Sequence, residues 1–179
     1  MWPLRGQSLR GALQVNASVM RVDLGTPMID DPTLERWGLV KAITPRAPGS
    51  LEDLYQGVPL RYPRHFEALC LSHQWESASL GEIELAENPP GKDLRSLAAA
   101  VRYDRLLWGY LVSKGYLIFG RRSGGRYDPV AFDLNQTNRE QAPIVWVDHE
   151  EILSFERLGT PKVLAPSIEA LLQEGASPK

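Results

Sequence analysis

The sequence of 179 residues has little cysteine and no long apolar run. Cys70 is its single cysteine, so no disulfide can form within the chain and the fold depends on its hydrophobic core. The longest apolar-leaning stretch, 106–112, is far shorter than the roughly 20 residues of a membrane-spanning helix. Arg5 and Arg10 are not followed by an apolar stretch of signal-peptide length. We therefore expect a cytoplasmic protein without a membrane anchor.

A charge excess of one sign is also absent. The chain carries 20 Lys and Arg against 22 Asp and Glu, a net charge of −2, which argues against a nucleic-acid-binding protein. The charge is nevertheless uneven, because residues 51–100 carry 4 basic and 8 acidic side chains while residues 101–150 carry 7 and 6. The first of these segments is thus a candidate surface for a basic partner, since complementary charge sets association rate and specificity.

Familiar catalytic motifs are missing as well: there is no Walker loop, no GxSxG and no HExxH. Cys70 falls on the apolar face of a predicted helix, which indicates an inert core thiol. Asp148 and His149 fall at the end of a predicted strand, where alternating side chains point to opposite faces. We therefore expect no catalytic residues, no metal site and no cofactor.

One enzymatic alternative stays open. Asp133, Asp148, His149 and the arginines of 121–126 would form a hydrolase site if they converged in a concave pocket. The test is geometric, because these side chains would have to lie within hydrogen-bonding or metal-ligand distance of one another.

The apolar periodicity predicts helices separated by short strands. Helices are expected over 34–40 after a Thr33 cap, from 51 after Ser50, over 62–76, over 94–105 after Asp93, and from Ser167. Strands are expected over 13–24, 80–87, 115–120, 129–134 and 144–149. The last three strands predict an antiparallel meander. The fold class is therefore α+β, with a mainly antiparallel sheet flanked by helices.

The segment 80–87 combines a strand pattern with acidic residues. Ile83 and Leu85 alternate with Glu82 and Glu84, which predicts one strand with a buried face and a solvated acidic face. Such a face, with a tryptophan just before it, is a candidate protein-binding surface. Its candidate contact residues are Trp75, Glu76, Glu82, Glu84 and Glu87.

The order of these elements resembles the SUKH superfamily, named for the yeast Smi/Knr cell-wall-synthesis regulators. The resemblance covers about residues 45–174. It is strongest over 124–150, where a glycine turn is followed by Asp-Pro-Val-Ala-Phe-Asp-Leu and then Val-Trp-Val-Asp-His-Glu. It implies a non-enzymatic domain: bacterial members resemble immunity proteins that bind and neutralise polymorphic toxins, and eukaryotic members are regulatory interaction proteins. The expected partner is thus a protein, such as a basic toxin domain, with a regulatory or scaffold role as the alternative.

The first residues have no counterpart in this resemblance. We divide the chain into an N-terminal extension over 1–45 with an added strand and short helix, a SUKH-like domain over 46–174 and a polar tail over 175–179. The extension is a candidate for dimerisation or for covering an exposed sheet edge. The sequence leaves the oligomeric state open.

Overall fold

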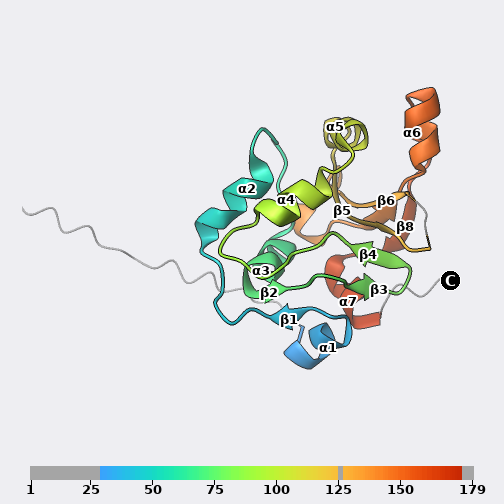
Figure 1. Cartoon of the computed structure of the whole chain (residues 1–179). Helices are drawn as coiled ribbons and strands as arrows, with labels where there is room; N and C mark the ends of the chain where they lie inside the picture. Colours follow the sequence, from blue (N-terminus) through green and yellow to red (C-terminus); the bar gives the residue numbers. More distant parts are fainter. Residues whose placement is uncertain (1–28, 125–126, 175–179) are drawn as a thin grey trace, which may run out of the picture.

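The computed structural model describes residues 29–124 and 127–174 and has an α+β architecture, as predicted (Figure 1). Its helices are α1 Asp31–Arg36, η1 Pro48–Leu51, α2 Glu52–Tyr55, α3 Arg64–Ser72, α4 Arg95–Val101, α5 Arg105–Ser113, η2 Arg139–Gln141, α6 His149–Phe155 and α7 Ile168–Glu174. Its strands are β1 Val40–Lys41, β2 His73–Gln74, β3 Ser79–Leu80, β4 Ile83–Leu85, β5 Tyr116–Arg122, β6 Pro129–Asp133, β7 Ile144–Trp146 and β8 Lys162–Ala165. Within these residues, no helix is long and apolar enough to cross a membrane.

The main sheet is an antiparallel meander in the order β3-β4-β5-β6-β7-β8. Each strand pairs with its sequence neighbour, and all five pairings are antiparallel. The predicted meander of β5, β6 and β7 is therefore confirmed and is extended on both sides. A separate pair, β1 with β2, forms a small second sheet.

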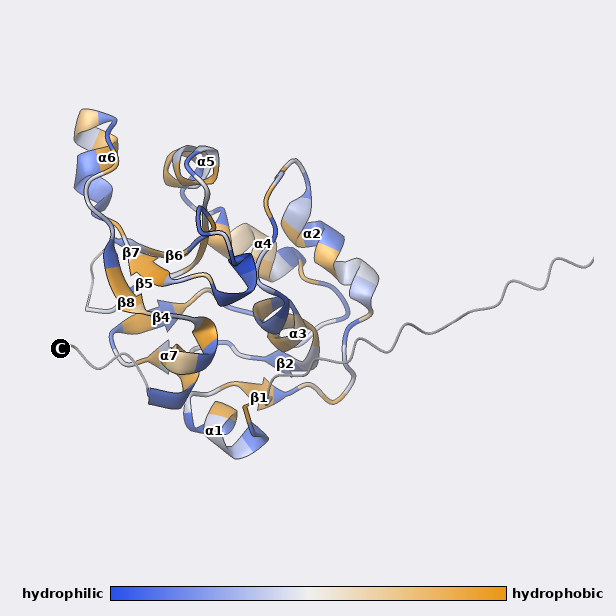
Figure 2. Cartoon of the chain, turned by 180° about the vertical axis from the view of Figure 1, so that it is seen from behind, coloured by the Kyte–Doolittle hydropathy of each residue, from blue (hydrophilic) through white to orange (hydrophobic). Residues whose placement is uncertain are grey.

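One face of the main sheet packs against α3. The rings of Phe66, Phe119 and Phe132 lie 4.6–5.5 Å apart between centroids, joining α3 to β5 and β6. The Tyr62 hydroxyl donates a hydrogen bond of 2.5 Å to the carbonyl of Ile118, next to the irregularity in the pairing of β5 with β6. Figure 2 shows apolar residues concentrated on these central strands, which are covered on both faces.

The opposite face of the main sheet is covered by α5, a helix that the sequence pattern did not predict. The helix predicted over 94–105 ends at Val101 as α4, and after a short turn the cap residue Asp104 precedes a second helix, α5. The Asp104 carboxylate accepts hydrogen bonds of 3.0 Å from the amides of Leu106 and Leu107, which caps α5. The buried side of α5 then packs on β5, and α5 also contacts α6 (Figure 1).

The secondary structure of the acidic segment 80–87 also differs from the prediction. It is a tight hairpin, in which Leu80 of β3 pairs with Ile83 of β4 across Gly81 and Glu82. Gly81 has a φ of +62°, a conformation that suits glycine. The prediction of a single strand with one continuous acidic face is therefore wrong, although Ile83 and Leu85 are buried as expected.

Several helix ends differ by a few residues from the prediction. Asp30, rather than Thr33, caps α1, because its carboxylate accepts a hydrogen bond from the Thr33 amide. Ser50 lies inside η1 and donates to the carbonyl of Lys92 instead of capping a helix. The helix predicted over 62–76 ends at Ser72, where β2 begins. Ser167, in contrast, caps α7 through a 3.3 Å bond from the Ala170 amide, as expected.

The described part of the predicted N-terminal extension packs into the common core. Leu34 and Leu39 are buried in the same hydrophobic cluster as the rest of the domain. The Trp37 indole donates a 2.8 Å hydrogen bond to the carbonyl of Leu172 in α7. Leu34 and Leu39 thus share one hydrophobic core with residues beyond position 45. The strand predicted over 13–24 and the tail over 175–179 lie outside the described residues.

A buried arginine ties several loops together. Arg46 is almost fully buried, and its guanidinium donates to the carbonyls of Cys70, His73, Pro89 and Asp93. The side-chain amide of Asn88 donates to two of the same carbonyls, those of Cys70 and His73. Burial lowers the pKa of Arg46. We call these two side chains and their four acceptors the Arg46 hub.

Candidate partner-binding groove

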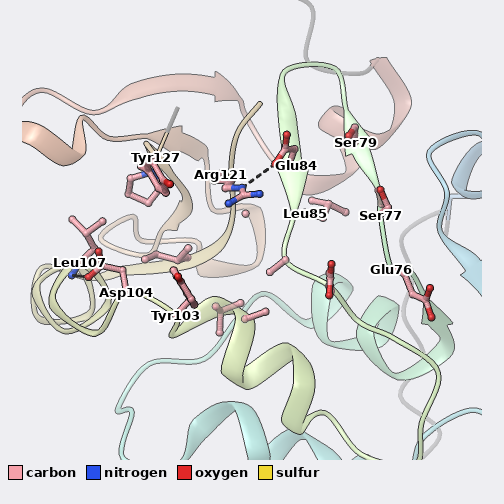
Figure 3. Close-up of a pocket in the computed structure, with 18 residues that line it drawn as sticks. Glu76, Ser77, Ser79, Glu84, Leu85, Tyr103, Asp104, Leu107, Arg121 and Tyr127 are labelled. Atoms are coloured by element: carbon pink, nitrogen blue, oxygen red, sulfur yellow. Dashed lines mark hydrogen bonds and ion pairs between the residues drawn. The ribbon is translucent and has the colours of Figure 1, made fainter. Parts of the chain in front are cut away.

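A groove of about 630 Å³ lies between the β3–β4 hairpin, the α4–α5 junction and the start of β6 (Figure 3). We call it the acidic groove. Its described lining residues are Glu76, Ser77, Ala78, Ser79, Glu84, Leu85, Ala86, Glu87, Ala100, Val101, Tyr103, Asp104, Leu107, Ile118, Gly120, Arg121, Tyr127 and Pro129.

The floor of the acidic groove is apolar and its rim is aromatic. Leu85, Leu107 and Ile118 are buried beneath it and come from β4, α5 and β5. Tyr103 is 88% exposed and Tyr127 is 66% exposed at its edge. Tyrosine is enriched in the hot spots of protein–protein interfaces, so two exposed tyrosines beside an apolar floor are typical of such a contact.

Carboxylates outnumber cations in the described lining. Glu76, Glu84, Glu87 and Asp104 face one guanidinium, that of Arg121. Arg121 Nε lies 2.8 Å from Glu84 Oε2, so this pair is balanced within the chain. Among the described residues, Glu76 and Glu87 form no ion pair, and both are exposed. The unbalanced negative charge of the described lining therefore comes from Glu76, Glu87 and Asp104. Figure 3 shows Asp104 on the helix side of the groove, across from Glu76.

The five sequence candidates are thus divided by the fold. Glu76, Glu84 and Glu87 line the groove. Glu82 lies in the hairpin turn and its carboxylate pairs with Arg122 at 2.7 Å. Arg121 and Arg122 are consecutive in β5, where successive side chains point to opposite faces. Glu82 and Glu84 therefore do not share one face, which corrects the expectation from period-two alternation.

Trp75 lies beneath this region rather than on it. Its side chain is 3% exposed, and its indole Nε1 donates a 2.7 Å hydrogen bond to the carbonyl of Ala86. The backbone of Trp75 also pairs with that of Asn88. Trp75 therefore positions the segments that carry Glu76 and Glu87, and it has no surface to offer a partner.

Three groove residues were missed by sequence reasoning: Tyr103, Asp104 and Tyr127. The periodicity predicts a helix over 94–105 that would contain Tyr103 and Asp104, whereas both lie between α4 and α5. An aspartate directly before the apolar run 106–112 was the available signal for a new helix start. Nothing in the sequence signals that Tyr127 lies beside them, because it reaches the groove through strand pairing.

A second polar cluster lies at the other end of the β6–β7 pair from Asp133. His149 Nδ1 is 2.9 Å from Asp128 Oδ1, and Asp128 is only 9% exposed. Ligand-type atoms of Asp128, Asp148 and His149 all lie within 4.8 Å of one another. Asp148 caps α6 by accepting bonds from the amides of Glu150 and Glu151. The predicted strand end is therefore a helix start, and Asp148 and His149 lie together rather than on opposite faces.

The residues named for the hydrolase alternative are only partly brought together. Asp133 ends β6, where its carboxylate accepts a hydrogen bond from the Asn135 amide, whereas Asp128 precedes the start of the same strand. Arg121 and Arg122 are held in ion pairs with the hairpin, and Arg126 lies outside the described residues. Asp133 therefore stands apart from Asp148 and His149.

Cys70 is fully buried in α3, and burial raises the pKa of its thiol well above the usual range. This position agrees with the expected core role and opposes formation of the reactive thiolate.

Comparisons with protein-family models, with curated proteins and with solved structures give no match.

Proposed function

We propose that this protein is a non-enzymatic, SUKH-like protein-binding module that neutralises a bacterial toxin by binding it through the acidic groove. The observation that carries the proposal is the coincidence, in one groove, of unpaired carboxylates and exposed tyrosines over an apolar floor. This combination is typical of a binding hot spot surrounded by steering charges.

The groove favours a protein over a small ligand. Its rim is open to solvent, and Tyr103 projects almost completely from the surface. A small molecule would leave that ring exposed, whereas a protein surface would cover it and gain the apolar area. Leu106, two residues after Asp104 in the first turn of α5, is also exposed.

Two further features support the SUKH-like interpretation. The segment that carries the resemblance, 124–150, includes the paired strands β6 and β7 and the Asp148 cap of α6. The role of that segment in this chain is architectural, because Val130, Phe132 and Ile144 are fully buried. A scaffold of this kind leaves function to surface residues, as expected for a binding module.

The test is co-expression with candidate toxins, chosen from any toxin-like genes that lie next to the gene for this protein. We expect growth to be restored by the wild-type chain and lost with the pair Glu76→Lys and Glu87→Lys. The matched control is Glu35→Lys with Glu52→Lys, which changes the charge equally on α1 and α2, outside the groove lining. Absence of rescue by the wild-type chain with any neighbouring toxin would refute the immunity function.

A further inference from the structure

We propose that the acidic groove receives an arginine side chain presented by an extended segment of the partner protein. This inference rests on the proposed protein-binding function and specifies the chemistry that the groove recognises. It follows from three properties of the groove: its apolar floor, the position of its carboxylates and the exposed tyrosine at its rim.

The apolar floor fits the stem of a long side chain. Leu85, Leu107 and Ile118 present hydrocarbon below, while the carboxylates of Glu76 and Glu87 stand at the exposed rim. Lysine and arginine bury their methylene groups along apolar surface and keep the charged head near water. A short acidic or purely apolar side chain would leave either the floor or the rim unmatched.

The rim favours a guanidinium over an ammonium. Tyr103 offers an aromatic face on which a planar guanidinium stacks, and carboxylates accept its paired N–H groups. The groove already contains one such contact, since Arg121 donates to Glu84 at 2.8 Å on its hairpin side. Elsewhere in this chain guanidinium groups also lie over aromatic rings, as Arg122 does over Trp146 at 4.6 Å.

The volume sets the size of what enters. A groove of about 630 Å³ holds a few side chains and not a folded element. It lies between the β3–β4 hairpin, which carries Glu84, and the α4–α5 junction, which carries Tyr103 and Asp104 (Figure 3). A partner must therefore insert a narrow segment between these two walls, and an extended loop satisfies that requirement.

The experiment is an NMR titration of the full chain with a capped hexapeptide of alternating arginine and glycine, with the lysine and glutamate versions as comparisons. We expect saturable amide shifts at Glu76, Ser77, Glu87, Tyr103 and Leu107, several-fold tighter binding of the arginine peptide than of the lysine peptide, and none for the glutamate peptide. Raising salt from 0.05 to 0.3 M should weaken binding, because the contact is between exposed charges.

Variants make the assignment specific. The pair Glu76→Gln and Glu87→Gln should weaken binding of the arginine peptide at least ten-fold. Tyr103→Ala should also weaken it. Tyr103→Leu should not restore this binding, whereas Tyr103→Phe should restore it. The control pair Glu35→Gln and Glu52→Gln should stay within two-fold of wild type. Unchanged thermal unfolding of each variant shows that loss of binding is not loss of fold.

The outcomes separate this inference from the proposed function. No saturable shift at millimolar arginine peptide, or an equal loss in the control pair, overturns the arginine assignment. Rescue from a toxin that is insensitive to the Glu76 and Glu87 variants also overturns it, while leaving the immunity function standing. If the peptide binds specifically but the chain restores growth against none of the neighbouring toxins, the groove chemistry is supported and the immunity function is refuted.

Discussion

Replacing Arg46 by methionine tests whether the Arg46 hub holds the α3 end and the two loops after it. Methionine keeps much of the volume and removes all four hydrogen bonds. The carbonyls of Cys70 and His73 keep their bonds from Asn88, so the loss falls on those of Pro89 and Asp93.

The expected cost follows from these two acceptors. Each unsatisfied, partly buried carbonyl costs about 1–3 kcal/mol, and removing a buried guanidinium recovers part of its desolvation penalty. We therefore expect the free energy of unfolding to fall by about 2–4 kcal/mol, since the recovered penalty offsets only part of the loss. In a domain of this size each lost kcal/mol lowers the melting temperature by roughly 2–4 °C.

The assay is urea unfolding followed by tryptophan fluorescence, combined with a double-mutant cycle. Asn88→Ala alone leaves the carbonyls of Cys70 and His73 with the Arg46 donor. The double variant leaves them with neither, so its cost should exceed the sum of the single costs by about 1 kcal/mol or more. Arg61→Met, at an exposed arginine 3.5 Å from Glu52, is the control and should change stability by less than about 0.5 kcal/mol. A cost below about 1 kcal/mol for Arg46→Met, or strict additivity, would refute the reasoning.

Three further predictions concern backbone space, pH and thiol reactivity. Gly120→Ala places a Cβ 2.5 Å from a backbone oxygen of β4 and should lower the free energy of unfolding by about 1–3 kcal/mol. Gly109→Ala, in the open middle of α5, should raise it by about 0.5–1 kcal/mol. Equal shifts of the two melting temperatures would contradict this. Burial lowers the pKa of His73, with Asp31 acting in the opposite direction. The unfolded chain then binds the proton more readily than the folded chain does. The contribution of His73 to stability is therefore full above pH about 6.5 and falls as the pH is lowered. In urea titrations between pH 7.5 and 5, His73→Asn should lose less stability than the wild type. Cys70 should react with an aromatic disulfide reagent only at the rate of unfolding, and fast labelling of the native protein would disprove its burial.

The central meander could be predicted because its strands follow local rules. The strand around Ile118 is an apolar run between glycines, and the strand around Phe132 alternates in period two. The local pattern led to a wrong prediction where one polar residue allowed two interpretations. Asp148 before two glutamates suits a strand end or a helix cap, and only the fold shows that its carboxylate accepts the Glu150 and Glu151 amides.

The groove was less predictable because it is assembled from distant segments. Glu76 and Glu87 flank the β3–β4 hairpin, Tyr103 comes from the α4–α5 junction, and Tyr127 lies just before β6. Each position has an ordinary local reading as a solvated residue. Their common surface depends on the pairing of β4 with β5 and on the position of α5, which are long-range features.

The charge of the acidic segment shows why spatial pairing matters for function. A count along the sequence treats Glu82 and Glu84 as free negative charge, but β4 pairs with β5 and brings each to an arginine. The negative charge available to a partner thus shifts to Glu76 and Glu87. Glu82→Gln should then leave arginine-peptide affinity within two-fold of wild type, because its carboxylate lies outside the groove lining and is paired with Arg122. A ten-fold loss in that variant, measured by the same titration, would return the binding surface to the hairpin turn.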